Sequence, residues 1–397
     1  YSTRRRGFVY MLAVVTGRRI REAFPHITYH TAYNDFGLNL YKSVVTSPKS
    51  PQNVFISPFC LHSILSMTYV GAAGNTKQQF ESALKLDGLK EGTQEAYQQF
   101  INKVPLKYFN IANRLYLQSK GTVLEDFKQS CKTNFNAEAV TLRFEDDAEA
   151  GRTTINQWVE GETKGKIQEL IPQGSLSSDT ALVLVNAIYF KGDWDVKFDR
   201  ATTIKDSFHL NENESLEVNF MRKEAKFNFG YSASLNCQIL EIPYQNKDLS
   251  MLIVLPLVMD GLKDLEAKLD SAALSKLQTE MSVDEVEIRI PRFSIESSMT
   301  LIDSLTSMGI EEAFIAGKAD LSKIDGTRNL FVSDVFHKTF IVVNEEGSEA
   351  AAAGAVGIST KMLPPSFTAD HPFLFYIKDN STDMILFLGR LVQPGLV

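Results

Sequence analysis

The order of apolar and polar positions predicts helices and strands that follow one another along the whole chain. Residues 181–190 are apolar and rich in β-branched side chains, which is typical of a strand covered on both faces. The runs 336–343 and 372–377 have the same strand-like character. We expect an amphipathic helix to open at Asn34 and a mostly apolar, buried helix over 59–73.

The remaining pattern completes a mixed α+β chain. Ser57 and Pro58 are a natural N-cap and first-turn residue for the buried helix. A polar helix is expected over 79–109, a strand over 110–118, and an amphipathic helix over 154–172 that a proline ends. No Pro/Gly/Ser-rich linker and no internal repeat divides the 397 residues, so we predict one large domain.

A connection from Asn344 to Asp370 is longer than compact domains usually contain, which indicates a functional or disordered segment. It contains four consecutive alanines, 350–353, and no charge between Glu349 and Lys361. At a period of two, small apolar side chains make up one face, which is suited to burial between packed strands. The other face could meet water or a thin cover. The segment is therefore able to lie exposed and also to become a central strand.

Composition excludes several classes of function. The formal net charge of −7 argues against general nucleic-acid binding, and no apolar run approaches the roughly 18 to 20 residues of a membrane span. Cys60, Cys131 and Cys237 are widely spaced and odd in number, so we predict buried free thiols and neither a disulfide framework nor a metal site. Nothing in the sequence indicates a cofactor.

The N-terminal residues 1–33 are atypical. Three arginines at 4–6 precede a short apolar run over 8–15, which is consistent with the remains of a secretory signal or with a non-native, disordered leader. Asn213 and Asn380 begin Asn-x-Ser/Thr triplets and are candidate glycosylation sites. These features favour a secreted glycoprotein, with a cytoplasmic protein as the alternative.

Motifs of common enzymes do not occur in this sequence. Residues 230–234 read Gly-Tyr-Ser-Ala-Ser, which is not the nucleophile elbow of α/β hydrolases. The six histidines do not form His-Glu-x-x-His, and neither a Walker loop nor a dinucleotide-binding fingerprint is present. His337 lies in an apolar strand, where a lone histidine is more often a hydrogen-bonded core residue than a catalyst. We therefore predict a protein that is not an enzyme.

Residues Glu345 to Ala352, Glu-Glu-Gly-Ser-Glu-Ala-Ala-Ala, resemble the hinge of the serpins, the serine protease inhibitor family. The run 181–194 closely resembles the family motif Leu-Val-x-Asn-Ala-x-Tyr-Phe-Lys-Gly-x-Trp, and similar matches continue in order over 34–394. The resemblance implies the serpin fold, a single large domain over 34–397. That fold has three β-sheets, about nine helices and an exposed reactive-centre loop, here about 345–371.

The resemblance also assigns roles to single residues. In inhibitory members the cleaved bond follows the sixteenth residue after the first hinge glutamate, which gives Lys361–Met362 here, and Pro372 stands at the family's usual spacing of eleven residues beyond Lys361. Trp194 would lie at the top of the main sheet, at the breach where the loop enters, although simple core packing is an alternative. The expected hinge residues are Glu345, Glu346, Gly347, Ser348, Glu349, Ala350, Ala351, Ala352 and Ala353.

A buried cluster beneath the opening point of the sheet, the shutter, would consist of Ser57, Asn186 and His337. Its role would be to let strands part and close again. The chain departs from the family pattern at Cys60, where most members have a second serine three residues after the first. A thiol forms weaker hydrogen bonds than a hydroxyl.

By resemblance, we expect a metastable suicide-substrate inhibitor of trypsin-like serine proteases. The protease would attack the carbonyl of Lys361, and the loop would insert as a new central strand and trap the covalent acyl complex. The alternatives are a non-inhibitory serpin with a carrier, storage or chaperone role, and a hydrolase with an unrecognised site.

We expect a monomer that binds neither nucleic acid nor membranes. Some relatives bind heparin through basic residues in the region that corresponds to the polar helix. Here only scattered lysines such as Lys90, Lys103 and Lys107 are present, so heparin binding is not supported.

Overall fold

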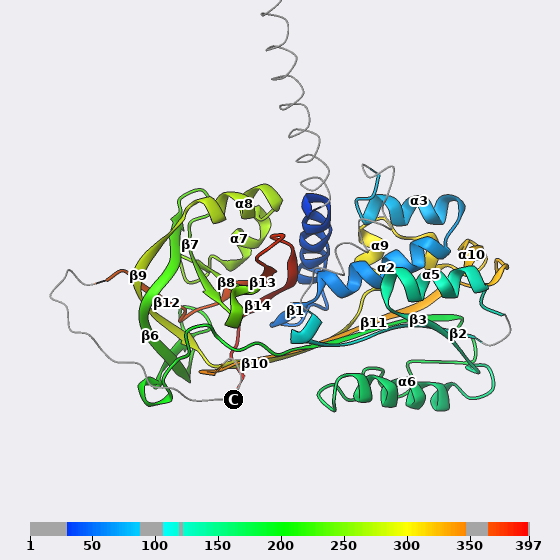
Figure 1. Cartoon of the computed structure of the whole chain (residues 1–397), viewed down its shortest axis with the longest axis horizontal. Helices are drawn as coiled ribbons and strands as arrows, with labels where there is room; N and C mark the ends of the chain where they lie inside the picture. The colour runs from blue at the N-terminus through cyan, green and yellow to red at the C-terminus, as the bar shows by residue number, and fades with distance from the viewer. Residues whose placement is uncertain (1–29, 88–105, 119–121, 347–363, 396–397) are drawn as a thin grey trace, which may run out of the picture.

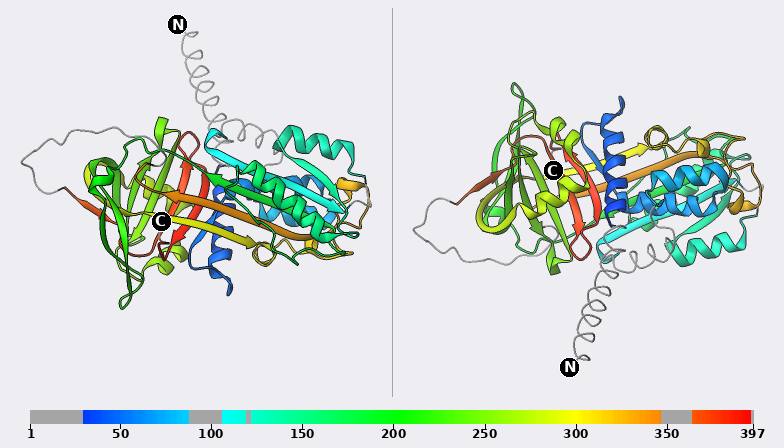
Figure 2. Two further views of the ribbon diagram at one scale, coloured as in Figure 1. Left: turned by 90° about the horizontal axis from the view of Figure 1, so that it is seen from below. Right: turned by 90° about the horizontal axis from the view of Figure 1, so that it is seen from above.

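The structure is a computed structural model that describes residues 30–87, 106–118, 122–346 and 364–395. Two β-sheets dominate these residues, and helices pack on their faces (Figures 1 and 2). The smaller sheet has five strands. In spatial order they are β10 (Phe293–Thr300), β11 (Val332–Val343), β4 (Leu182–Phe190), β2 (Phe109–Gln118) and β3 (Glu138–Leu142).

Both faces of the five-stranded sheet are covered. Helix α6 (Ala148–Glu162) lies on one face, and α2 (Pro58–Gly71) packs on the opposite face (Figure 1). Successive residues of β4 alternate between two cores: Leu182 and Leu184 join the main core, whereas Val183 and Val185 pack in the cluster beneath α6. This double burial explains why β4 is apolar at nearly every position, as its sequence predicts.

The second sheet has nine strands and makes up the other end of the molecule (Figure 1). Its long strand β6 pairs with β5 and β9 over most of its length and with β7 near its end, so hydrogen bonds join two of the three expected sheets into one path. The strands are β1 (Val54–Ile56), β14 (Ile385–Leu391), β13 (Phe373–Asp379), β8 (Leu249–Pro256), β7 (Cys237–Pro243), β6 (Ser215–Ser232), β9 (Met281–Pro291) and β12 (Ser366–Thr368), with β5 (Ile204–His209) paired to β6.

Shorter helices complete the described residues. Residues 30–46 are helical and stand between the two sheets (Figure 1). The others are α3 (Gly74–Ala83), α5 (Glu125–Phe135), α7 (Leu262–Lys268), α8 (Ser271–Thr279), α9 (Ile302–Ser307) and α10 (Ser322–Asp325). Short 3-10 turns lie at Leu106–Tyr108, Arg200–Thr202, Gln245–Lys247 and Glu312–Phe314. No helix in the described ranges is both long and apolar enough to cross a membrane.

Helix α2 begins and ends as local chemistry requires. Ser57 is the N-cap, its side chain accepts a hydrogen bond from Cys60 N, and Pro58 occupies the first helical position, as predicted. At the other end, a Cβ atom on Gly71 would lie 2.3 Å from Cγ1 of Ile324, so only glycine allows this close contact with α10. The cap defines where α2 begins, and the glycine lets α2 pack closely against α10.

Several predicted boundaries are wrong. Helix α6 begins at Ala148, where the Asp147 side chain caps it, and ends at Glu162, well before the proline that was expected to stop it. Left-handed backbone at Lys164 and Gly165 prevents its continuation. The predicted polar helix over 79–109 is also too long, because α3 ends at Ala83 and Phe109 already belongs to β2.

The predicted start of the folded domain at Asn34 is a few residues late. Tyr33 is buried, and its hydroxyl donates a hydrogen bond of 2.9 Å to Ile385 O on β14. Residues 30–33 therefore belong to the first helix. The rest of the predicted leader, residues 1–29, lies outside the described residues.

Candidate functional site

The central seam of the five-stranded sheet lies between β4 and β11. These strands pair in parallel, from Leu182 opposite Val332 to Tyr189 opposite Phe340. Their direct pairing means that no strand lies between them. Because the chain leaves β11 toward the predicted loop, the structure shows the sheet before any insertion of that loop at this seam.

Trp194 lies at the end of the seam and holds the chain that leaves β11. Its indole N–H donates to Asn344 O at 2.8 Å, and its backbone N–H donates to Glu346 O at 3.3 Å. The indole also stacks on Tyr244, with 4.6 Å between ring centroids. Trp194 is buried, so it both packs in the core and fixes the first residues after the strand.

The two glutamates at the start of the predicted hinge have different environments. Glu345 is 2% exposed, accepts a hydrogen bond of 2.6 Å from Thr203 Oγ1, and places Oε2 at 3.5 Å from Arg292 Nε. Glu346 pairs with the more exposed Arg200. A buried carboxylate with these two partners anchors the chain at the point where it leaves the sheet.

The other predicted hinge residues and the reactive bond lie outside the described residues. They are Gly347, Ser348, Glu349, Ala350, Ala351, Ala352 and Ala353, with Lys361 and Met362. The chain is described again from Pro364, and Pro365 O accepts a hydrogen bond from Glu287 N before β12 pairs with β9. The predicted loop end at residue 371 is therefore too late, because residues 366–368 are a strand of the larger sheet.

Ser57, Asn186 and His337 meet beneath the seam. His337 Nδ1 lies 2.5 Å from Asn186 Oδ1, and these two residues stand opposite each other on β11 and β4. The backbone N–H of Ser57 donates to His337 Nε2 at 3.1 Å, while the Ser57 hydroxyl donates to Leu386 O at 3.0 Å. The cluster thus connects both strands of the seam with α2 and with β14.

The hydrogen bonds define the protonation state of His337. Nε2 accepts from Ser57 N–H and must be unprotonated, so Nδ1 carries the proton and donates to the Asn186 carbonyl oxygen. Burial lowers the pKa of His337 to about 3. The side chain is therefore neutral at physiological pH, and it links β11 to β4 without a charge that would have to be solvated.

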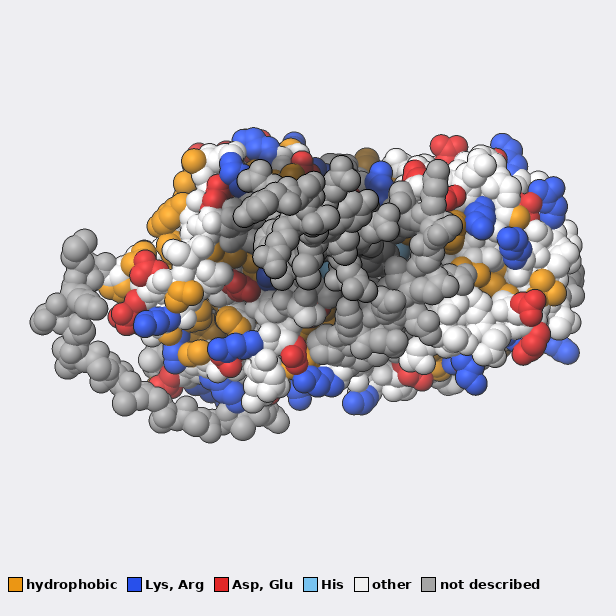
Figure 3. All heavy atoms as spheres, turned by 45° about the horizontal axis from the view of Figure 1, so that its top comes forward, with side chains coloured by type: hydrophobic (Ala, Val, Ile, Leu, Met, Phe, Trp, Pro, Cys, Tyr) orange, Lys and Arg blue, Asp and Glu red, His pale blue; other side chains and the backbone are white. Residues whose placement is uncertain are grey.

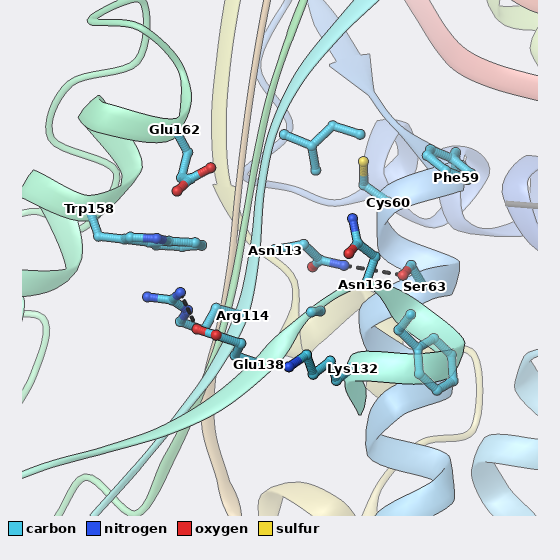
Figure 4. Close-up of a pocket in the computed structure, with 13 residues that line it drawn as sticks. Phe59, Cys60, Ser63, Asn113, Arg114, Lys132, Asn136, Glu138, Trp158 and Glu162 are labelled. Atoms are coloured by element: carbon cyan, nitrogen blue, oxygen red, sulfur yellow. Dashed lines mark hydrogen bonds and ion pairs between the residues drawn. The ribbon is translucent and has the colours of Figure 1, made fainter. Parts of the chain in front are cut away.

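Cys60, the departure from the family pattern, lies beside this cluster. Its thiol is buried, and burial raises the pKa to about 11, although hydrogen bonds from Ser57 and Asn186 oppose the shift. Cys60 also lines a cavity of about 340 Å³ between α2, β2 and α5, where Asn113 Nδ2 donates to Ser63 Oγ at 3.1 Å (Figure 4). A neutral thiol in this position contributes packing more than hydrogen bonding.

Cys131 and Cys237 are also buried free thiols, which agrees with the interpretation of the three cysteines. Within the ranges that the structure describes, no group of His, Cys, Asp and Glu side chains is arranged to hold a metal ion.

Lys107, one of the scattered lysines, pairs with Asp248 at 3.0 Å. Lys90 and Lys103 lie outside the described residues. Basic and acidic side chains are interspersed over the visible face (Figure 3).

The candidate glycosylation sites differ in accessibility. Asn213 is exposed in the turn between β5 and β6. Asn380 is partly buried, and its Nδ2 donates to Lys247 O at 3.0 Å and to Ser250 Oγ at 2.8 Å. Since a glycan is attached at Nδ2, these contacts leave Asn213 as the accessible candidate.

Sequence reasoning did not identify Thr203, Arg292 or Lys338 as parts of this site. Lys338, nearly buried on β11, donates to Gln168 O at 2.8 Å and pairs with Glu296 at 2.6 Å, which ties the segment after α6 to the seam. Lys338 follows His337 directly, and a lysine inside an apolar strand is the signal that could have revealed it. Thr203 and Arg292 carry no comparable local signal.

Comparisons with known proteins agree with this architecture. The family model described as serpin (serine protease inhibitor) matches residues 31–394. The leukocyte elastase inhibitor of Homo sapiens is 41% identical over 378 residues, which cover 92% of this chain and 99% of that protein. The leukocyte elastase inhibitor of Xenopus tropicalis is 40% identical over 373 residues, with the same two coverages.

Solved structures show the same fold. Uncleaved ovalbumin superposes with a TM-score of 0.86 at 31% identity, covering 92% of this chain and 99% of ovalbumin. Serpin48 of the insect Tenebrio molitor gives a TM-score of 0.84 at 32% identity, covering 94% of this chain and all of the other. The α+β fold class and the family resemblance are thereby confirmed. The chain belongs to the serpin family of serine protease inhibitors.

Proposed function

We propose that this serpin is a suicide-substrate inhibitor of trypsin-like serine proteases that is cleaved between Lys361 and Met362. The direct parallel pairing of β4 with β11 carries the proposal, because the loop that follows β11 can still enter this seam. Insertion of the loop into the sheet is the established behaviour of inhibitory serpins. Lys361 is the only basic residue between Glu349 and Asp370, so a protease with an acidic primary pocket would cut there.

Strand direction makes insertion favourable. The chain reverses after β11, so an inserted segment runs antiparallel to β11 and, because β4 is parallel to β11, also antiparallel to β4. One parallel ladder is then replaced by two antiparallel ladders, which are slightly more stable per residue. A net gain of on the order of ten backbone hydrogen bonds, at about 1 kcal/mol each, gives roughly 10 kcal/mol.

The residues of the segment suit both sides of this seam. The described sheet is covered by α6 on one face and by α2 on the other, so an inserted strand is buried on both. Alanine and glycine fill most positions of either parity between Ala350 and Gly357. Small side chains on both faces let the strand enter without overpacking the existing cores.

The chemical step belongs to the protease. Its serine oxygen attacks the carbonyl carbon of Lys361, the bond to the Met362 nitrogen breaks, and the Met362 amine leaves with a proton. Lys361 then carries the ester bond. If the segment beginning at Gly347 enters the seam before water attacks this ester, the bound protease is dragged away from its functional geometry and remains attached.

We assign Trp194 and the cluster of Ser57, Asn186 and His337 to the control of this step. Trp194 holds Asn344 and Glu346 at the entrance by two hydrogen bonds, and the His337–Asn186 bond crosses the seam itself. The His337–Asn186 bond must break before a strand can enter, whereas the Trp194 bonds hold the residues directly before the segment that would insert.

A second candidate target is an elastase-type protease, because the similar proteins from Homo sapiens and Xenopus tropicalis are named leukocyte elastase inhibitors. Such a protease would cut beside a small apolar residue of the same loop and would not depend on Lys361. Cleavage-site mapping separates the two targets.

The test is incubation with trypsin or with elastase, followed by a denaturing gel and mass spectrometry of the released C-terminal peptide. With trypsin we expect a covalent complex and a peptide that begins at Met362. Lys361→Glu should abolish the trypsin complex, while Lys318→Glu, a charge reversal at an exposed position, should preserve it. A trypsin complex that survives Lys361→Glu would show that the assigned bond is wrong.

The alternative of a non-inhibitory serpin predicts a different result in the melting curve. Insertion of the cleaved loop should raise the melting temperature strongly, because the additional ladder stabilises the sheet. Equal melting temperatures of intact and cleaved protein, with free protease recovered, would favour a carrier, storage or chaperone role.

We further propose a monomer, which light scattering of the purified protein would test. We also propose that the protein is secreted, and a cytoplasmic location is the alternative. If it is secreted, a glycan should be found on Asn213 and not on Asn380, whose amide nitrogen is already engaged. An unmodified Asn213 in protein purified from its natural source would favour the cytoplasmic alternative.

A further inference from the structure

A second cavity lies beside the first helix and α7. Its volume is about 630 Å³, within the range of small-molecule sites. It joins the C-terminal end of the helix 30–46, the turn before β6, α7 and the end of β14. Its apolar lining comes from Val45, Leu210, Met259, Leu262, Ala267, Pro372 and Val392.

The charges around this cavity are unequal. Arg390 and Glu266 pair with each other at 3.3 Å, and Tyr41 also donates to Glu266 at 2.6 Å, so these partly or fully buried groups satisfy one another. Among the described residues neither Lys42 nor Lys263, which also line the cavity, forms an ion pair. Lys42 has one long hydrogen bond, 3.4 Å to a backbone oxygen, and Lys263 is exposed.

Asp260 is the remaining carboxylate of the lining, and it does not lie within ion-pair distance of a described cation. Counting every charged side chain of the lining leaves an excess of one positive charge: Lys42, Lys263 and Arg390 against Asp260 and Glu266. The excess lies on the two lysines, because Arg390 is occupied by Glu266.

We propose that this cavity binds a long-chain anionic amphiphile such as a free fatty acid. The alkyl chain would lie against the apolar lining, and the carboxylate would lie between Lys42 and Lys263. At about 30 Å³ per water molecule, the volume holds about twenty waters, which is comparable to the number of non-hydrogen atoms in such a ligand.

The adjoining surface supports an apolar ligand. Leu257 and Val258 directly precede the lining residue Met259 and are 50% and 49% exposed. Most exposed side chains of this size are isolated, whereas these two are adjacent in the sequence and directly precede a residue of the lining.

The site does not depend on the proposed inhibitory function. It contains no residue of the seam, the hinge or the buried cluster, so a failure of fatty-acid binding would leave the inhibitory proposal intact, and the reverse also holds. A bound ligand would connect the first helix to α7 and β14, and would raise the stability of the whole chain in proportion to ligand concentration.

The experiment titrates the full chain with oleate below its critical micelle concentration and measures displacement of a dansyl-labelled fatty acid. Lys263→Glu should weaken oleate binding about tenfold or more, whereas Lys268→Glu, the same change at an exposed position of α7 outside the cavity, should not. Thr46→Trp, at an exposed position of the lining, should obstruct the cavity and weaken the binding of both oleate and the dansyl-labelled fatty acid.

Two further binding measurements, with oleyl alcohol and with anionic vesicles, define the class of ligand. Oleyl alcohol, which lacks the charge, should bind at least tenfold more weakly than oleate to the native chain. Equal effects of Lys263→Glu and Lys268→Glu, or equal binding of alcohol and acid, would overturn the proposal. Binding to anionic vesicles without binding to monomeric oleate would overturn it also, and would indicate a membrane surface instead. Circular dichroism confirms that each exposed-site variant is folded.

Discussion

The neutral, buried His337 makes the unfolding of this protein sensitive to mild acid. The pKa of His337 is lowered to about 3 by burial, whereas an unfolded histidine titrates near pH 6.5. The unfolded chain therefore binds a proton between these two values that the folded chain does not bind. The stabilisation is complete above pH 6.5 and decreases as the pH falls toward 3.

The magnitude follows from proton linkage. Between pH 6.5 and pH 3, each pH unit lowers the free energy of unfolding by about 1.4 kcal/mol per such histidine. At pH 5 the loss from His337 is about 2 kcal/mol. His62 on α2, with a pKa lowered to about 4 by burial, adds a similar amount, so the two together give about 4 kcal/mol. This is a large part of the stability of an ordinary domain.

The assay is urea unfolding at pH 7.5 and pH 5.0, followed by tryptophan fluorescence, for native protein and for His337→Gln. In this window most carboxylates remain ionised in both states, so the difference between the two pH values reports the histidines. We expect His337→Gln to lower the free energy of unfolding at pH 7.5, because it removes the imidazole that bonds to Ser57 N–H and to Asn186 Oδ1. It should also reduce the pH-dependent loss of stability by about 2 kcal/mol.

His62→Gln should reduce the pH-dependent loss by a similar amount without touching the seam, and the double variant should show the two reductions together. The reasoning is refuted if His337→Gln retains the full pH-dependent loss of the native protein. In that case His337 would accept its proton in the folded state, and the hydrogen bond from Ser57 N–H to Nε2 would not persist.

Three further predictions concern the entrance and the seam. Trp194→Phe should lower the free energy of unfolding by about 1 kcal/mol through loss of the indole bond to Asn344 O, measured by urea denaturation with Trp158 as the remaining fluorophore. Lys338→Met keeps an apolar stem but removes the bond to Gln168 O, so amide hydrogen exchange should accelerate in the segment after α6; unchanged exchange would exclude a tie at this point. Ala350→Arg should convert the inhibitor into a cleaved substrate, because an inserted strand would bury an unpaired charge, and a covalent trypsin complex at native yield would contradict this.

Local sequence rules were reliable where local chemistry decides the structure. The cap at Ser57 and Pro58 and the continuous burial of β4 follow from residue types at adjacent positions. The same rules failed for α6, because the signal for its end is left-handed backbone at Lys164 and Gly165, which the periodic pattern does not reveal. They also placed a strand of the larger sheet, β12, inside the predicted loop, since three residues are too few to show a period.

Contacts between residues far apart in the sequence could be predicted only from the family resemblance, and some could not be predicted at all. The resemblance grouped Ser57, Asn186 and His337, which stand far apart in the sequence, and the structure brings them into hydrogen-bond contact. Neither source gave the partners of Glu345. Thr203 and Arg292 come from a 3-10 turn boundary and a strand junction, and their convergence on one carboxylate depends on how the two sheets meet.

Polar contacts gather at this seam for a physical reason that bears on function. A sheet that must open at one seam cannot be held there by a thick apolar core alone, because such a core would have to be exposed on opening. At this seam the parallel ladder between β4 and β11 is supplemented by a few polar contacts: the His337–Asn186 bond across the seam, the hydrogen bond of Trp194 to Asn344 O, and the hydrogen bond of Lys338 to Gln168 O. Each contributes on the order of 1 to 3 kcal/mol, which is small beside the roughly 10 kcal/mol that a new pair of antiparallel ladders would supply. The contacts can therefore delay insertion without preventing it, and that balance is what an inhibitor of this kind requires.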